Sequence, residues 1–103
     1  MITVITQFQL PAPLTREAAK QIFMSTAPKY RDYPGLIRKY YHLSEDGRMS
    51  GAVYLWKSRA AAEKLYTEEW KRVVTEKYRS APSLVFYDCS VVVDNIAQEI
   101  IDD

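Results

Sequence analysis

Apolar residues alternate with polar ones, or cluster in short runs, in four parts of the chain, and this pattern is typical of β-strands. The four segments are residues 2–10, 36–43, 50–57 and 83–93. The first is followed by Pro11 and Pro13, which lack the backbone N–H that a strand ladder needs. The second and third flank a polar connection with Asp46-Gly47, which favours a tight hairpin turn. The pattern therefore predicts four strands, two of them joined as an antiparallel hairpin.

Between the first two strands, apolar residues recur at helical spacing. Thr15 is a suitable N-cap for this helix, and Glu17 lies in its first turn, where a negative charge is favourable. Pro28 cannot donate a backbone hydrogen bond to the carbonyl of Met24, and its ring would clash with that carbonyl. We therefore expect the helix to stop or bend near Ala27.

A second helical stretch follows the third strand. Ser58 is a suitable N-cap, and the small and apolar residues after it recur four apart on one side. Thr67 precedes two glutamates and has the features of another helix start, so we expect a break and a short further helix to about Tyr78. In the tail, Asp94 or Asn95 could cap one or two final helical turns.

The order strand, helix, strand, strand, helix, strand is the split βαβ pattern of a ferredoxin-like fold. A chain of 103 residues has room for one domain with its own core. We therefore predict a single α+β domain over residues 1–103, ordered βαββαβ, with a four-stranded antiparallel sheet covered by helices on one face.

The uncovered face of that sheet should also be apolar. In the fourth strand Leu84 and Phe86 alternate with Val85 and Tyr87, so neither face is polar enough to remain in water. A large exposed apolar patch normally marks an association surface. We expect a second copy of the sheet to cover this face, as in a homodimer.

Composition limits the partners and the compartment. Fourteen basic and thirteen acidic residues are interleaved and leave a net charge of +1, so the chain creates no strong field for nucleic acid. The third strand also lacks the glycine and aromatic signature of RNA-recognition domains. No segment approaches the ~20 apolar residues of a membrane span, and the only cysteine, Cys89, suits a reducing compartment. We expect a cytoplasmic protein without nucleic-acid or membrane partners.

Motifs for nucleotide cofactors and metal centres are absent from the sequence: it has no glycine-rich phosphate loop and no His/Cys cluster at metal-ligand spacing. His42, the only histidine, could act as an acid or base near neutral pH if it faces a cavity, although strand histidines are more often solvated or hydrogen-bonded. Lys39 could hold an anionic ligand, although a strand lysine is by default solvated.

Aromatic residues crowd onto the predicted sheet and the second helical region. They are Tyr40, Tyr41, Tyr54, Trp56, Tyr66, Trp70, Phe86 and Tyr87. Such rings usually form a core, but tyrosine and tryptophan also offer polar groups to a small planar ligand in an apolar pocket. The sequence does not decide which face of strand 36–43 would line such a pocket. Both faces carry aromatics, and a one-residue change of register exchanges them.

Three segments carry a resemblance to a known family. Residues 34–41 (PGLIRKYY), residues 51–58 (GAVYLWKS) and Tyr87-Asp88 resemble the dimeric α+β barrel superfamily, and within it the YdhR-like mono-oxygenases. The resemblance covers nearly the whole chain. It implies that two sheets pair back to back in a dimer, and that each subunit has a ligand cavity between its sheet and its helices.

The resemblance also implies a chemistry. The related antibiotic-biosynthesis mono-oxygenases oxidise aromatic polyketides with molecular oxygen and without metal or flavin, the substrate supplying electrons as an enolate or phenolate. Such chemistry needs a dry aromatic pocket, a base and polar groups that steady the oxygenated intermediate. Trp56 is at the strand position where those enzymes carry a pocket aromatic, and Tyr54 shares its face.

Another branch of the superfamily degrades haem and pairs a similar tryptophan with a first-strand asparagine and an axial histidine. Here the residue ten positions after Trp56 is Tyr66, and the first strand offers Gln7 and Gln9 but no asparagine. We therefore expect no haem and no other cofactor.

The hypothesis from the sequence is a cofactor-independent mono-oxygenase for a small aromatic or polyketide-like molecule. The expected catalytic residues are His42 and Lys39. The expected substrate-binding residues are Tyr41, Tyr54, Trp56, Tyr66 and Tyr87. Two alternatives are a non-catalytic small-molecule binding domain with the same pocket and an isomerase or lyase, because one fold can host several reactions.

Overall fold

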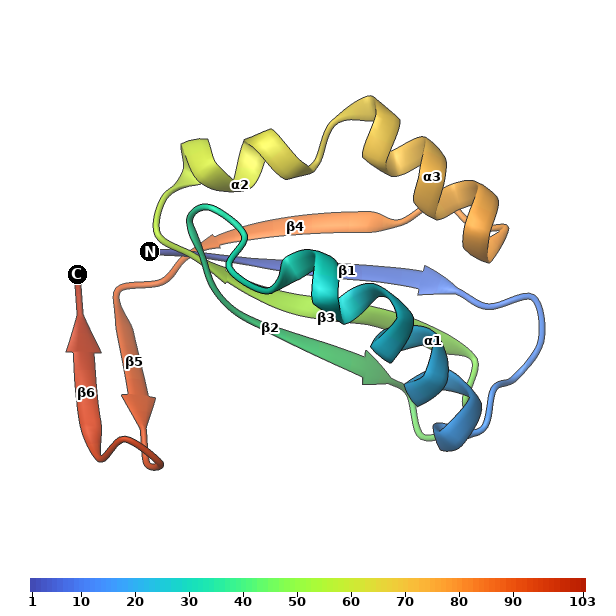
Figure 1. Cartoon of the computed structure of the whole chain (residues 1–103), viewed down its shortest axis with the longest axis horizontal. Helices are drawn as coiled ribbons and strands as arrows, with labels where there is room; N and C mark the ends of the chain where they lie inside the picture. The colour runs from blue at the N-terminus through green and yellow to red at the C-terminus, as the bar shows by residue number, and fades with distance from the viewer.

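The four long strands form one antiparallel sheet in the order β2-β3-β1-β4, and the computed structural model describes the whole chain, residues 1–103 (Figure 1). The strands are β1 (Ile2–Gln9), β2 (Leu36–Leu43), β3 (Met49–Trp56) and β4 (Ser83–Asp88). β2 and β3 are joined by the predicted hairpin, in which Gly47 has a φ of 74°. The predicted ferredoxin-like α+β sheet is confirmed.

Three helices begin at the predicted caps. They are α1 (Arg16–Tyr30), α2 (Arg59–Leu65) and α3 (Glu68–Tyr78). The hydroxyl oxygens of Thr15, Ser58 and Thr67 each accept a hydrogen bond from the backbone N–H three residues further on, at 3.1 to 3.2 Å. The predicted break between the second and third helices is confirmed. None of the three is both long and apolar enough to cross a membrane.

Of the predicted stop or bend of α1 near Ala27, the stop is wrong, because the helix continues through Pro28 to Tyr30. Pro28 lies in the last turn, where only one intrahelical bond is lost and no further turn has to be aligned. The helix then ends as the N–H of Arg31 donates to the carbonyl of Pro28 at 3.3 Å. The extra turn carries Tyr30 over the sheet, where its ring lies 6.1 Å from that of Tyr54.

The prediction of a fourth strand to residue 93 and a helical tail is also wrong. β4 ends at Asp88, opposite Ile2, the first residue of β1, and one further bond, from the N–H of Cys89 to the carbonyl of Met1, follows at 2.9 Å. The chain turns away and forms a separate two-stranded hairpin of β5 (Val91–Asp94) and β6 (Glu99–Asp102), which stands at one end of the sheet (Figure 1). The Asp94 carboxylate caps the turn and not a helix.

In that turn the Asp94 carboxylate accepts the N–H groups of Ile96 and Ala97 at 3.0 and 3.1 Å. The β-branched residues on either side can then pair across the hairpin, as in Val93 opposite Ile100. The same carboxylate forms an ion pair with Arg38 of β2. Asp94 is buried, so this contact ties the hairpin to the sheet.

The core lies between the sheet and α2. Its buried members are Val4, Ala52, Tyr54, Trp56, Ala62, Leu65 and Tyr66. Trp56 is fully buried, and its indole N–H donates to the Tyr66 hydroxyl at 3.1 Å. The Trp56 ring is stacked with Tyr54 and meets Tyr66 and Tyr33 edge-on, with centroids about 6 Å apart in each pair. The aromatic cluster predicted from sequence is therefore partly a structural core.

A bulge in β2 decides which of its residues face the helices. Leu36 pairs with Trp56 and Arg38 pairs with the next residue of β3, so Ile37 has no partner in the ladder. Beyond this extra residue the alternation is shifted by one position. Lys39 and Tyr41 therefore lie on the helix-covered face, and Tyr40 and His42 lie on the other.

The opposite face of the sheet is apolar and uncovered within the chain. Tyr40, Val85 and Tyr87 are 53%, 43% and 52% exposed there. The separate hairpin also exposes apolar side chains, those of Val91, Val93 and Ile100, each by more than half. The prediction that both faces of the sheet are apolar is confirmed.

Candidate functional site

A cavity of about 120 Å³ lies between the helix-covered face of the sheet and helices α1 and α3. Sixteen residues line it, ten of them hydrophobic: Thr6, Phe8, Phe23, Thr26, Lys29, Tyr30, Lys39, Tyr41, Gly51, Ala52, Tyr54, Trp70, Val73, Val74, Lys77 and Tyr78. A cavity of roughly 150 Å³ in another protein holds benzene. The volume here therefore suits about one aromatic ring.

The Lys39 amine lies at the wall of this cavity, among three tyrosine rings. Its Nζ is 3.4 Å from the ring centroid of Tyr30, 4.0 Å from that of Tyr41 and 4.7 Å from that of Tyr54. None of the ion pairs of the structure includes Lys39. The amine therefore has aromatic faces around it but no carboxylate to neutralise a charge.

This environment lowers the pKa of Lys39 from its ordinary value of 10.5 to about 7. Burial is the larger cause, because it penalises the charged form, and the positive charge of Lys29 adds to it. The attraction between the ammonium and the tyrosine faces opposes the shift but does not replace lost hydration. Near neutral pH a large share of Lys39 is therefore an uncharged amine, which can accept a proton.

Two tyrosine hydroxyls complete the polar groups around the amine. The Tyr41 hydroxyl lies 2.9 Å from the hydroxyl oxygen of Thr26 on α1, and its ring is 4.9 Å from that of Phe23. Burial raises the pKa of Tyr41 above its usual value, and it raises that of Tyr54 well beyond the usual range. Both phenols are therefore protonated near neutral pH and can act as hydrogen-bond donors.

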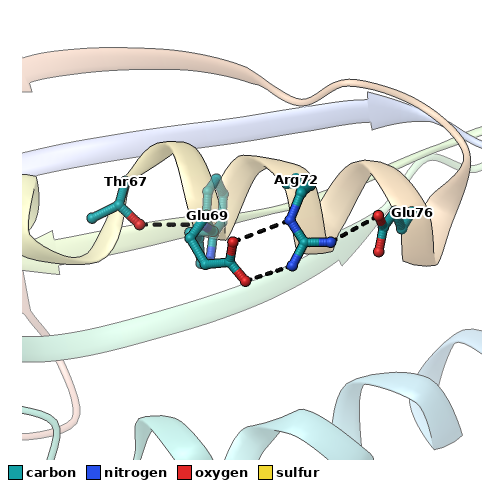
Figure 2. A network of polar contacts seen from close by, with 5 residues as sticks. Thr67, Glu69, Arg72 and Glu76 are labelled. Atoms are coloured by element: carbon teal, nitrogen blue, oxygen red, sulfur yellow. Dashed lines mark hydrogen bonds and ion pairs between the residues drawn. The ribbon is translucent and has the colours of Figure 1, made fainter.

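Helix α3 forms the outer wall of the cavity, and its charges are divided between its two sides. On the outer side Arg72 lies between Glu69 and Glu76, at 2.6 and 2.8 Å, while Thr67 caps the helix (Figure 2). The hydrogen bonds from Arg72 hold the pKa of Glu69 below its usual value. The acidic residues of α3 are thus engaged away from the cavity, whereas Lys77 lines it.

A second, more open hollow of about 610 Å³ lies between the start of α1 and the β2–β3 turn. It shares Phe23 and Tyr41 with the cavity, so these two side chains stand between the two spaces. Its other lining includes charged residues, among them Arg16 and Asp46. The hollow is therefore a more polar space next to the apolar cavity.

Of the residues expected from the sequence, Lys39, Tyr41 and Tyr54 are brought together at the cavity. Trp56 and Tyr66 are not among its lining residues. They lie in the core, where Tyr54 stacks on the Trp56 ring. Their part in a site would be to hold Tyr54 in place.

His42 and Tyr87 are not brought to the cavity, because both lie on the opposite face of the sheet. Tyr87 is largely exposed there. Burial lowers the pKa of His42, and its Nε2 is buried without a hydrogen-bond partner. The bulge at Ile37 is the physical reason that Lys39, and not His42, faces the cavity.

Several lining residues were not expected as site residues. Those from α1 are Phe23, Thr26, Lys29 and Tyr30, and those from α3 are Trp70, Val73, Val74, Lys77 and Tyr78. Their spacing of three and four marks one side of each helix, which is a visible signal. That signal alone does not separate a core stripe from a cavity wall. The structure has no group of three or more His, Cys, Asp or Glu side chains placed to hold a metal ion.

Comparison with protein-family models and with curated proteins finds no match. Solved structures do match. The mono-oxygenase ActVA-Orf6 of Streptomyces coelicolor, solved in complex with nanaomycin D, is 18% identical, covers 90% of this chain and 90% of its own, and has a TM-score of 0.66. SnoaB of Streptomyces nogalater, a cofactor-independent oxygenase, is 14% identical over 91% of this chain and 97% of its own, with a TM-score of 0.64.

A structure described as an antibiotic biosynthesis monooxygenase is 21% identical, with coverage of 86% and 98% and a TM-score of 0.62. These identities are too low to transfer an activity, but the structures match along almost the full length of both chains. The expected resemblance is therefore confirmed for the backbone. These structural neighbours are described as mono-oxygenases or as a cofactor-independent oxygenase, and the chain has their ferredoxin-like α+β fold.

Proposed function

We propose that the protein is a cofactor-independent mono-oxygenase that acts on a small aromatic or polyketide-like molecule. The observation that carries the proposal is the Lys39 amine, which lies in an aromatic cavity without a carboxylate and is partly uncharged near neutral pH. A general base works best when its pKa is near the working pH. The mono-oxygenase structures with the same fold support the reaction class.

In the proposed reaction the substrate supplies the electrons. The Lys39 amine takes a proton from an acidic O–H or C–H group of the bound aromatic, which leaves a phenolate or enolate. The electron-rich carbon then forms a bond to molecular oxygen. Loss of water converts a CH₂ group to a carbonyl, so one oxygen atom enters the product, the other leaves as water, and the carbon is oxidised by four electrons. Lys39 returns its proton to the departing oxygen.

The rest of the cavity suits these steps. Tyr41 and Tyr54 carry protonated hydroxyls that can donate to a negative oxygen. The apolar wall excludes water, which strengthens such contacts. A molecule larger than one ring would have to displace Phe23 and Tyr41 toward the second hollow, or displace α3, which has no fully buried residue.

An oxygen electrode tests the reaction. With a panel of phenols and anthrones we expect the protein to consume oxygen and to form a carbonyl product. Replacing Lys39 by methionine keeps the length of the side chain but removes the base, so the rate is expected to fall by about 10² to 10⁴-fold. Lys64→Met, an exposed lysine on α2, is the control and should keep the full rate.

Each alternative gives a different result in the same assay. No turnover of any panel member would contradict the proposal and favour a binding domain. Turnover without oxygen uptake would indicate an isomerase or lyase that uses the same base. The partly uncharged Lys39 amine at the cavity supports an enzyme over a carrier, because removing a proton from a substrate requires a base and binding alone does not.

We also propose that two copies pair through the uncovered sheet face. The exposed Tyr40, Val85 and Tyr87 form an apolar surface that is costly to leave in water. The free thiol of Cys89 supports a cytoplasmic location.

Analytical ultracentrifugation tests the pairing. We expect the wild-type protein to sediment at twice the chain mass of 11.9 kDa at micromolar concentration. Val85→Asp puts a charge on the proposed interface, on the edge strand β4, and should give the single-chain mass. Met24→Asp is the matched control, because Met24 is exposed on α1 and should leave the dimer intact. A single-chain mass for the wild type would refute the pairing.

A further inference from the structure

The charges around the cavity are all of one sign. Lys29, Lys39 and Lys77 line it, and no aspartate or glutamate does. The whole chain has nearly equal numbers of basic and acidic residues, so this imbalance is local and does not follow from composition. A cavity with three amines and no carboxylate offers a favourable place to a negative group.

The lysines differ in position. Lys39 is largely buried at the cavity wall, whereas Lys29 and Lys77 are exposed at its rim. Each rim amine lies near a tyrosine ring that also lines the cavity, at 5.6 Å from Tyr30 and 5.8 Å from Tyr78. None of the three lysines takes part in the ion pairs of the structure. Their positive charges are therefore free to act on a ligand.

No element that lines the cavity around Lys39 supplies a compensating negative charge. The titratable groups at the cavity are Lys29 and Tyr30 from α1, Tyr41 from β2, Tyr54 from β3, and Lys77 and Tyr78 from α3. β1 contributes only Thr6 and Phe8. Of the glutamates of α3, Glu69 and Glu76 pair with Arg72 (Figure 2), and Glu68 pairs with Lys71. The structure therefore has no internal counter-ion for Lys39.

We infer that the cavity binds a one-ring aromatic acid as its anion, with the negative group at the Lys39 amine and the ring among the tyrosines. The inference rests on the proposed function for the choice of cavity: the bound anion corresponds to the deprotonated substrate beside the Lys39 ammonium. It adds the charge and the size of the ligand. The cavity volume of about 120 Å³ limits the ligand to about one aromatic ring. The hydroxyl groups of Thr26 and Tyr41, 2.9 Å apart, belong to residues that also line the cavity and offer further polar contacts to the ligand.

A linked protonation follows from this arrangement. The empty site holds Lys39 largely uncharged above pH 7, because its pKa is about 7. An anion next to the amine favours the ammonium form and raises the pKa of Lys39 again. Binding above neutral pH is therefore accompanied by uptake of a proton from solution, and binding below neutral pH is not.

Isothermal titration calorimetry of the full chain with benzoate, in buffers of different ionisation enthalpy, measures both affinity and proton uptake. For the wild type we expect an uptake of about one proton at pH 8 and close to zero at about pH 6. Benzamide, a neutral molecule of the same shape, should bind at least about tenfold more weakly than benzoate.

Two variants separate charge from structure. Lys39→Met should weaken benzoate binding by about tenfold or more and abolish the proton uptake, with circular dichroism showing that it folds. Lys39→Arg keeps a permanent positive charge, so it should retain binding of benzoate but show no uptake at pH 8. A purely structural role of Lys39 would not produce this split between affinity and uptake.

The inference is overturned if benzoate does not bind, if benzamide binds as tightly, or if the uptake persists in Lys39→Arg. These outcomes are distinct from failure of the proposed function. Benzoate binding with the expected uptake, together with no oxygen consumption on any aromatic, would leave the anion site standing and remove the oxygenase. Oxygen consumption on aromatics, together with no preference of the cavity for anions over neutral molecules, would leave the oxygenase standing and remove the anion site.

Discussion

Replacing Trp56 by alanine is expected to remove a large part of the folding free energy. The side chain is fully buried among Tyr33, Tyr54 and Tyr66, so its loss leaves a cavity that the surrounding rings cannot fill. Substitutions of this kind cost about 3 to 5 kcal/mol, and a small domain has only about 5 to 15 kcal/mol in total. Urea unfolding followed by circular dichroism measures the change without relying on tryptophan fluorescence.

Two further variants divide this effect between packing and hydrogen bonding. Trp56→Phe keeps most of the apolar contact but leaves the Tyr66 hydroxyl without its donor. Tyr66→Phe keeps both rings and leaves the buried indole N–H without an acceptor, at a cost of about 1 to 3 kcal/mol. Trp70→Ala, a partly buried tryptophan on α3, should cost less than Trp56→Ala. Equal losses for both tryptophans would contradict the assignment of Trp56 to the core.

Replacing Lys39 by methionine is expected to stabilise the fold near and below neutral pH. In the folded state the pKa of Lys39 is about 7, and in the unfolded state it is near 10.5. Below pH 7 both states carry the charge, and the folded state bears the full cost of burying it. Because each pKa unit is worth about 1.4 kcal/mol, the difference between the two values corresponds to a few kcal/mol in favour of the variant.

The pH dependence of folding stability shows in which direction the difference between the wild type and Lys39→Met changes. Between pH 7 and 10.5 the unfolded wild type binds one more proton than the folded protein, so wild-type stability rises with pH in this window. The variant lacks this rise, and its advantage should shrink as the pH increases. Thermal unfolding from about pH 6 to about pH 9.5 measures the trend before the tyrosines ionise. Lys64→Met should follow the wild type, and a wild-type stability that falls from pH 7 to 9 would contradict the shift.

The order of the elements could be predicted from the sequence where local signals agree with tertiary contacts. Thr15, Ser58 and Thr67 are caps in the structure because cap chemistry acts within one turn. The tail was mispredicted because Asp94 caps a turn as readily as a helix. Its contact with Arg38 joins residues 56 positions apart, and no local pattern contains such a contact.

The site was predictable only in part for the same reason. Lys39, Tyr41 and Tyr54 were recognisable as aromatic-rich strand residues with one cation. Which residues of β2 face the helices depends on the bulge at Ile37, and no residue type in the sequence indicates a bulge there. The sequence therefore could not decide whether His42 or Lys39 faces the cavity. Whether a tryptophan lines a cavity or fills a core depends on packing with α2, and Trp56 fills the core.

The unpaired Ile37 also has a consequence for comparing this chain with distant relatives. Because that residue is surplus to the ladder, a homologue that lacks it would still present the equivalents of Lys39 and Tyr41 to the helices. An alignment gap placed at position 37 is therefore neutral for side-chain orientation. If the gap is placed after Arg38 instead, the aligned residues of β2 no longer match their partners in β3. The residue aligned with the cavity lysine would then be assigned to the uncovered face of the sheet.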